Sequence, residues 1–131
     1  VKKLLDQQAP LPLRLLLSFP VFDVNGKIEG NDKDPVVEAS LIEWLFAQLF
    51  INEKQSENTF SLLKQDFTNF PPMTVLTSNN DYLANHAAYL KKQNPKAELH
   101  NLGDISHTDF WYDPKGRMLQ EKAHILKYLI N

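Results

Sequence analysis

The stretch MTVLTSNNDYLANHAAYL, residues 73–90, decides the fold of this chain. Its first part, residues 73–77, is an apolar run of strand length. Polar residues follow and lead to Asp81. Beyond Asp81, apolar residues recur at helical spacing, namely Leu83, Ala87 and Leu90. The stretch therefore predicts a buried strand, then a loop that carries an acid, and then an amphipathic helix.

Strands and helices alternate on both sides of this stretch. Strand-like runs occupy residues 13–19, which fit a strand buried on both faces, and residues 97–102. Helical patterns cover residues 2–8, a segment behind a capping box of Ser40 and Glu43, and a C-terminal segment marked by Leu119, Ala123, Leu126 and Ile130. The alternation predicts an α/β fold with a mostly parallel sheet of about three strands, flanked by helices.

Length and composition exclude several classes of protein. The chain has 131 residues, of which 43% are hydrophobic, and this fits a single unit with a buried core. Its 14 basic and 16 acidic residues form no basic stripe, so we expect no nucleic-acid partner. The absence of cysteine excludes a disulfide scaffold and a thiolate nucleophile, and it suits a cytoplasmic location. No apolar run approaches the ~18 residues of a membrane span.

Asp81 and His107 are the candidate site residues. His107 lies in SHTDF, residues 106–110, after the strand-like run of residues 97–102, so an acid and then an imidazole each follow a strand. Simpler interpretations exist, because Asp81 could cap the helix that follows it and His107 could be a solvated loop histidine. A metal site is not expected, because the spacing of the nearby His and Asp residues matches no ligand motif, namely His100, Asp104, His107 and Asp109. His86 and His124 fall within helices and are expected at the surface.

Three further segments complete a recognisable pattern. LLLSFPVFD (residues 15–23) is similar to a strand that ends in Ser-Pro-x-x-Asp, although Phe19 stands between the Ser and the Pro. KDPVV (residues 33–37) is similar to an Asp-Pro-Leu-Leu segment before a Trp-containing helix, and GDISHTDF (residues 103–110) to a Gly-x-x-x-His-x-x-Phe loop. In order and spacing the chain resembles the C-terminal half of α/β-hydrolases, most closely the hormone-sensitive-lipase-like esterases. That family commonly has Gly where Ser78 stands.

The resemblance implies a carboxylic-ester hydrolase with a Ser-His-Asp triad and no cofactor. His107 would take the serine proton, and Asp81 would fix the tautomer of His107 and stabilise its imidazolium. Trp44 and Phe110 are candidates for binding the acyl-ester substrate. Helical spacing also suits core packing for Trp44, and Phe110 could instead pack over the C-terminal helix.

The nucleophile of such a triad is missing from the sequence. None of the four glycines brackets a serine in the pattern G-x-S-x-G, and no HGGG-type loop is present. We therefore expect residues 1–131 to form a single C-terminal portion of a hydrolase domain that is inactive alone. Its expected partner is the N-terminal half of the same protein, or a second copy bound through an exposed sheet edge. The alternative is a non-catalytic interaction domain that keeps a degenerate hydrolase fold.

Overall fold

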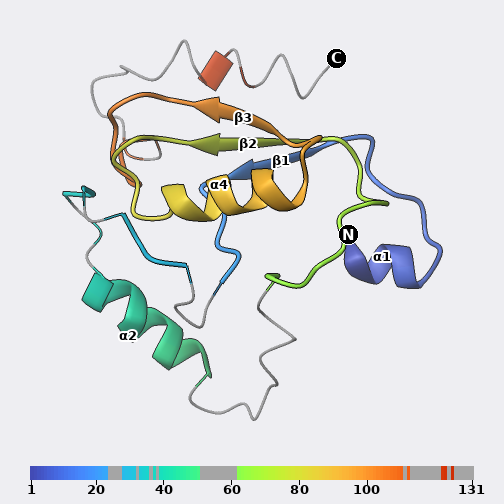
Figure 1. Cartoon of the computed structure of the whole chain (residues 1–131), viewed down its shortest axis with the longest axis horizontal. Coiled ribbons are helices and arrows are strands. Elements are labelled where there is room, and N and C mark those ends of the chain that lie inside the picture. The colour runs from blue at the N-terminus through green and yellow to red at the C-terminus, as the bar shows by residue number, and fades with distance from the viewer. Residues whose placement is uncertain are drawn as a thin grey trace.

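The computed structural model describes residues 1–23, 28–31, 33–35, 37, 39–50, 62–110, 112, 122–123 and 125. Within these residues, helices and strands alternate along the chain (Figure 1). They are α1 (Lys2–Asp6), β1 (Leu15–Ser18), α2 (Ala39–Phe50), β2 (Met73–Thr77), α4 (Ala84–Gln93) and β3 (Glu98–Asn101). No helix of this described part is long and apolar enough to cross a membrane.

The three strands form one parallel sheet in the order β1-β2-β3. Leu15 is paired with Met73, and Val75 with Leu99, so β2 is the central strand. This confirms the predicted α/β class with a parallel sheet of three strands. β1 is shorter than the predicted strand of residues 13–19, and Leu13 is 96% exposed.

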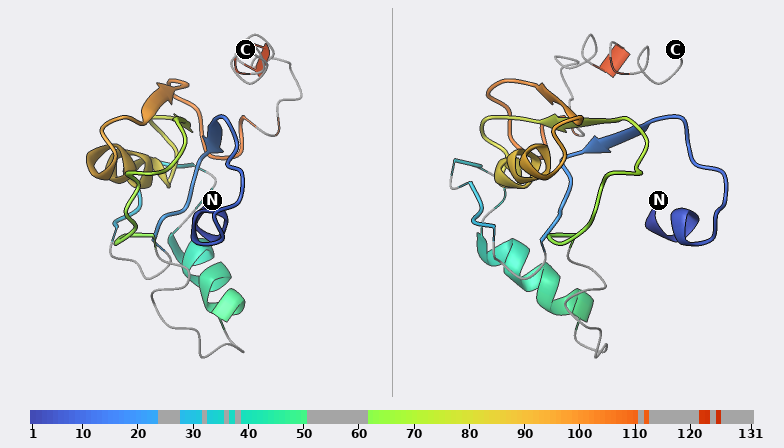
Figure 2. Two further views of the ribbon diagram at one scale, coloured as in Figure 1. Left: turned by 90° about the vertical axis from the view of Figure 1, so that its right-hand side faces the viewer. Right: turned by 45° about the vertical axis from the view of Figure 1, so that its right-hand side comes forward.

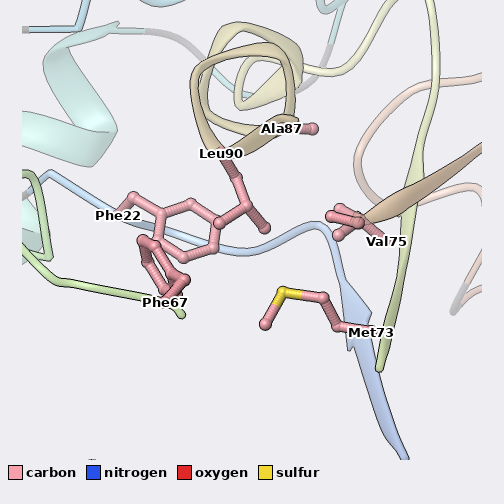
Figure 3. Packing of buried hydrophobic residues seen from close by; sticks show 7 residues of the cluster. Phe22, Phe67, Met73, Val75, Ala87 and Leu90 are labelled. Carbon is pink, nitrogen blue, oxygen red and sulfur yellow. The ribbon is translucent and has the colours of Figure 1, made fainter. Parts of the chain in front are cut away.

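Side chains of β2 point alternately to the two faces of the sheet and so build two cores. Met73 and Val75 face α4, and Figure 3 shows them converging with Leu90 and two phenylalanines. The buried members of this cluster are Phe22, Phe67, Met73, Val75, Ala87, Leu90 and Ala97. Leu76 faces the other side and packs with Phe19, Phe110 and Ile125. The central strand is therefore covered on both faces, as its apolar sequence requires.

Helix α4 packs on one face of the sheet (Figures 1 and 2). The predicted apolar face is confirmed, because Leu83, Ala87 and Leu90 are each at most 3% exposed. His86 lies on the same helix and is 3% exposed, so the expectation that it is a surface residue is wrong. Its burial has a structural reason, because its Nδ1 accepts the Phe22 backbone N–H at 3.0 Å. His124 lies outside the described residues.

Helix α2 differs from its prediction in two ways. It begins at Ala39, one residue before the Ser40 that was expected to cap it. It also lies away from the sheet (Figures 1 and 2), and Trp44 is 58% exposed, so the expected core packing of its indole is not found. Of the predicted C-terminal helix, the structure describes residues 122–123 and 125, which are helical.

Candidate active site

Asp81 and His107 meet at the carboxyl end of the sheet. Asp81 follows β2 by four residues, and His107 lies in the loop after β3. His107 Nδ1 lies 2.8 Å from Asp81 Oδ1, a hydrogen-bond distance. The Asp81 side chain is 1% exposed, whereas 27% of the His107 side chain is exposed. A buried carboxylate thus holds one imidazole nitrogen, while part of the ring remains accessible.

The Asp81 carboxylate is bound through one of its two oxygens. Oδ1 also accepts the Leu83 backbone N–H at 3.1 Å, and the Asp81 carbonyl accepts the Ala84 N–H at 3.0 Å. Asp81 therefore shapes the turn before α4 as well as contacting the histidine, although the residue at the N-cap of α4 is Leu83 and not Asp81. Oδ2 is buried and has no hydrogen-bond donor among the described residues.

The electrostatic environment of His107 favours its protonated form. The hydrogen bond with Asp81 raises the pKa of His107 above its ordinary value, and the charges of Asp81 and Asp34 add to the rise. Partial burial opposes them, because it disfavours a charged ring. Deeper in the fold the balance is reversed at His86, where burial lowers the pKa although the charges of Asp23 and Asp81 oppose the shift.

Hydrogen bonds join the loop after β2 (residues 78–83, the acid loop) directly to the loop after β3 (residues 102–110, the histidine loop). The Asn79 backbone N–H donates to the Gly103 carbonyl at 2.9 Å, and the Ser78 hydroxyl donates to the Ile105 carbonyl at 2.8 Å. Ser78 is 1% exposed, so the residue that departs from the family pattern uses its hydroxyl to hold the two loops together. Gly103 has φ +81°, a conformation that glycine adopts without strain, and it turns the chain away from β3.

Phe19 supports the histidine from the end of β1. It is the residue inserted in the Ser-Pro-x-x-Asp pattern, and it adopts a φ of +47°, which is unusual for a bulky side chain. Its N–H donates to the Leu76 carbonyl at 3.1 Å. Its ring meets the His107 ring edge-on, with centroids 5.4 Å apart, and also contacts Phe110. The inserted residue therefore forms a buried apolar wall beside the imidazole.

The two candidate substrate-binding residues lie in different surroundings. Phe110 is 5% exposed and packs in the core cluster with Ile125, as the packing alternative predicted. Trp44, on α2, is exposed at a distance from the sheet (Figure 1). Among the described residues, no three His, Cys, Asp or Glu side chains gather in a way that could hold a metal ion.

Sequence reasoning missed one residue that contacts both site loops. The sequence placed Asp34 only in the segment before the Trp-containing helix, and Asp34 does accept the Val37 N–H in that segment through Oδ1 at 3.0 Å. Its Oδ2 also accepts the backbone N–H groups of Tyr82 and His107, which lie 48 and 73 residues further along the chain. The Asp-Pro pair was a visible signal, but nothing in it indicates which distant amides the carboxylate would reach.

The chain has the fold of the C-terminal part of α/β-hydrolases, and solved esterases and lipases share this fold. An esterase from Pyrobaculum calidifontis has 18% sequence identity and a TM-score of 0.76, with 99% of this chain and 48% of that chain covered. A hormone-sensitive lipase from a metagenome library has 17% identity and a TM-score of 0.73, with coverages of 97% and 48%.

An esterase/lipase from an uncultured bacterium gives 17% identity and a TM-score of 0.74, with 92% of this chain and 43% of that chain covered. The chain thus spans less than half the length of these solved structures. No protein-family model matches the sequence, and no curated protein sequence is significantly similar to it. At such low identities the likeness establishes the fold.

Proposed function

We propose that this chain supplies the acid and the base of a Ser-His-Asp triad in a carboxylic-ester hydrolase. The observation that carries the proposal is the 2.8 Å contact between Asp81 Oδ1 and His107 Nδ1. The two residues follow neighbouring parallel strands in the order acid, then histidine, which is the order in α/β-hydrolases. The esterase and lipase neighbours support the same class of reaction.

In this proposal each ring nitrogen of His107 has a separate task. With Nδ1–H donating to Asp81, Nε2 is the nitrogen that can accept a proton. It takes the proton of a serine hydroxyl as the serine oxygen attacks the ester carbonyl, and then gives it to the departing alcohol oxygen. Water attacks the acyl-enzyme by the same route, and the acid product leaves. Asp81 keeps its hydrogen bond to Nδ1 throughout and stabilises the imidazolium.

The serine and the oxyanion donors of this proposal lie outside the 131 residues. The chain acts as the C-terminal portion of a longer hydrolase domain, and its natural partner is the N-terminal portion. β1 offers the surface for that contact, because among the described residues it is paired on one side only, with β2. All four of its residues are only partly buried. Without that portion, a second copy of the chain would bind the same edge.

Trp44 and Phe110 remain proposals for the substrate site. The exposed Trp44 indole could contact an acyl chain, whereas Phe110 would act from the core by supporting Phe19 beside His107. A Trp44→Ala change should then raise KM more for butyrate than for acetate esters. Equal effects on the two esters would exclude an acyl-binding role.

The test uses the complete protein that contains this chain, with p-nitrophenyl acetate and butyrate as substrates. His107→Ala and Asp81→Ala should each lower kcat severely, with the loss for His107→Ala at least as large, because the base is indispensable in a triad. Circular dichroism should show that both variants fold. The 131-residue chain alone should not hydrolyse either ester above the rate of its own His107→Ala variant.

Two matched variants serve as controls. His100→Ala removes a partly buried imidazole from β3, and Asp66→Ala removes an exposed carboxylate that binds Thr68. Both should keep kcat within a few-fold of the unmodified protein. Near-normal kcat in His107→Ala or Asp81→Ala would refute the role of that residue. A complete protein without hydrolase activity would favour the non-catalytic interaction domain.

A further inference from the structure

Residues 28–31 and 33–35, which lie between β1 and α2 in the chain, contact the acid loop, and we call them the strap. The Asn31 backbone N–H donates to the Tyr82 carbonyl at 2.9 Å, one residue beyond Asp81. The Tyr82 ring lies against Gly30, where a Cβ atom would overlap the end of the ring unless the ring moved. The Asn31 side-chain amide donates to the Asn79 carbonyl at 2.7 Å. The strap is therefore held to the acid loop by two hydrogen bonds and one packing contact.

Asp34 connects this strap to the histidine loop. Asp34 is 8% exposed, so water competes little for the oxygens of its carboxylate. Its Oδ2 accepts the Tyr82 N–H at 3.0 Å and the His107 N–H at 3.1 Å. A single buried oxygen atom thus joins the backbone beside Asp81 to the backbone of His107. Its other oxygen, bound to the Val37 N–H, holds the carboxylate in place.

We propose that Asp34 is a positioning residue that sets the distance and the orientation between Asp81 and His107. The proposal rests on the triad assignment and names a residue that acts through it. Hydrogen bonds between a charged acceptor and backbone amides are stronger than neutral ones and constrain the main chain of both loops at once. A misplacement of a catalytic group by about 1 Å can cost about 10²-fold in rate, so this constraint has a catalytic consequence.

Asp34 acts on His107 through its charge as well as through its hydrogen bond to the His107 backbone. The charged groups that face His107 are Asp81, from the acid loop, and Asp34, from the strap, and both favour the imidazolium. Within the histidine loop, Asp109 is occupied by the Ser106 N–H at 2.9 Å. Removing the charge of Asp34 should therefore lower the pKa of His107. The acidic limb of the kcat/KM profile, which reports the base in the free enzyme, should move to lower pH.

Two substitutions in the complete protein separate position from charge. Asp34→Asn has nearly the same volume, and its oxygen can keep the bonds to Tyr82 and His107 if its amide nitrogen faces Val37. We expect its kcat to stay within a few-fold, with the acidic limb shifted to lower pH. Asp34→Ala removes every acceptor, so kcat should fall by about 10²-fold with little change in KM, and the limb should shift as well.

Asp23→Asn is the matched control. Asp23 is 1% exposed, and its Oδ2 accepts a loop amide, that of Ile28, at 2.8 Å. It has no part in the pKa shift of His107, so this variant should leave the acidic limb unmoved. Thermal unfolding gives the folded fraction of each variant, and kcat is calculated from the concentration of folded protein. A loss of stability is then not counted as a loss of catalysis.

Amide hydrogen exchange provides a readout without activity. Asp34→Ala should accelerate exchange at the Tyr82 and His107 amides, and Asp23→Asn should not. Unchanged exchange at both amides, or an Asp34→Ala variant with normal kcat and an unmoved acidic limb, would overturn the proposal. If His107→Ala itself kept full activity, the triad assignment would fail, and the exchange result would still decide whether Asp34 joins the two loops.

Discussion

Asp81→Asn is the most informative single substitution, because the structure predicts which way the new amide will face. The Leu83 N–H lies 3.1 Å from Oδ1 and needs an acceptor there. The site is buried, so an amide nitrogen in that position would oppose a donor with no water to separate them. The asparagine oxygen should therefore occupy the Oδ1 position, where it still accepts a hydrogen bond from His107 Nδ1.

The size of the effect follows from this orientation. The tautomer of His107 is kept, and what is lost is the charge of its acceptor. A hydrogen bond to a charged group contributes about 1.5–3 kcal/mol and a neutral one about 0.5–1.5 kcal/mol, a difference of about 1–1.5 kcal/mol. This difference corresponds to a decrease in kcat of about tenfold. The opposite orientation of the asparagine amide would give the wrong tautomer of His107, and the wrong tautomer lowers kcat by about 10⁴-fold in a serine-protease triad.

The substitution should destabilise the fold only modestly. The buried Oδ2 position has no hydrogen-bond partner among the described residues before or after the change, so it adds little to the difference in the free energy of unfolding. What remains is the loss of the charged acceptor at Oδ1, about 1–1.5 kcal/mol, which urea unfolding would detect.

Steady-state kinetics on p-nitrophenyl butyrate give kcat for the complete protein, and ¹⁵N NMR of the imidazole gives the tautomer of His107. The reasoning is refuted by a decrease in kcat of about 10⁴-fold in a folded variant whose His107 carries its proton on Nε2.

Three further predictions concern stability and assembly. The pKa of His86 is lowered in the fold, so its stabilising contribution is complete above a pH of about 6.5 and is lost as the pH falls below that value. The stability advantage over His86→Gln in urea unfolding should therefore shrink between pH 7.5 and 5, and a constant difference would contradict this. Leu90→Ala, at a fully buried position, should cost about 2–5 kcal/mol. The half-exposed control Leu99→Ala should cost clearly less, and equal losses would show that α4 does not cover the core as described. The purified chain should dimerise through the edge of β1 that has no partner strand among the described residues, and light scattering that shows a stable 15.1 kDa monomer at tens of micromolar would exclude this.

The sequence by itself determined the elements whose physics is local. The run of residues 73–77 is a strand because it is apolar and bounded by prolines and polar residues, and the structure has β2 at those positions. The spacing of Leu83, Ala87 and Leu90 predicted the buried face of α4, because helical periodicity places these residues on one side. Alternation of strands and helices then required a parallel sheet.

The sequence also indicated which two residues to examine, because loops after neighbouring parallel strands lie at one edge of the sheet. It could not give their geometry. That Asp81 uses Oδ1 for both Leu83 and His107, and leaves Oδ2 without a described partner, depends on atoms placed by tertiary packing.

Tertiary structure alone decided the surroundings of His86 and Asp34. His86 falls in a helix of mixed polarity, and only the approach of the Phe22 backbone, 64 residues away, gives its Nδ1 a donor and makes its burial tolerable. Asp34 looks like a turn residue until the fold brings the amides of Tyr82 and His107 to its Oδ2. Hydrogen bonds between residues far apart in the sequence leave no periodic pattern in it, so local sequence patterns cannot predict them.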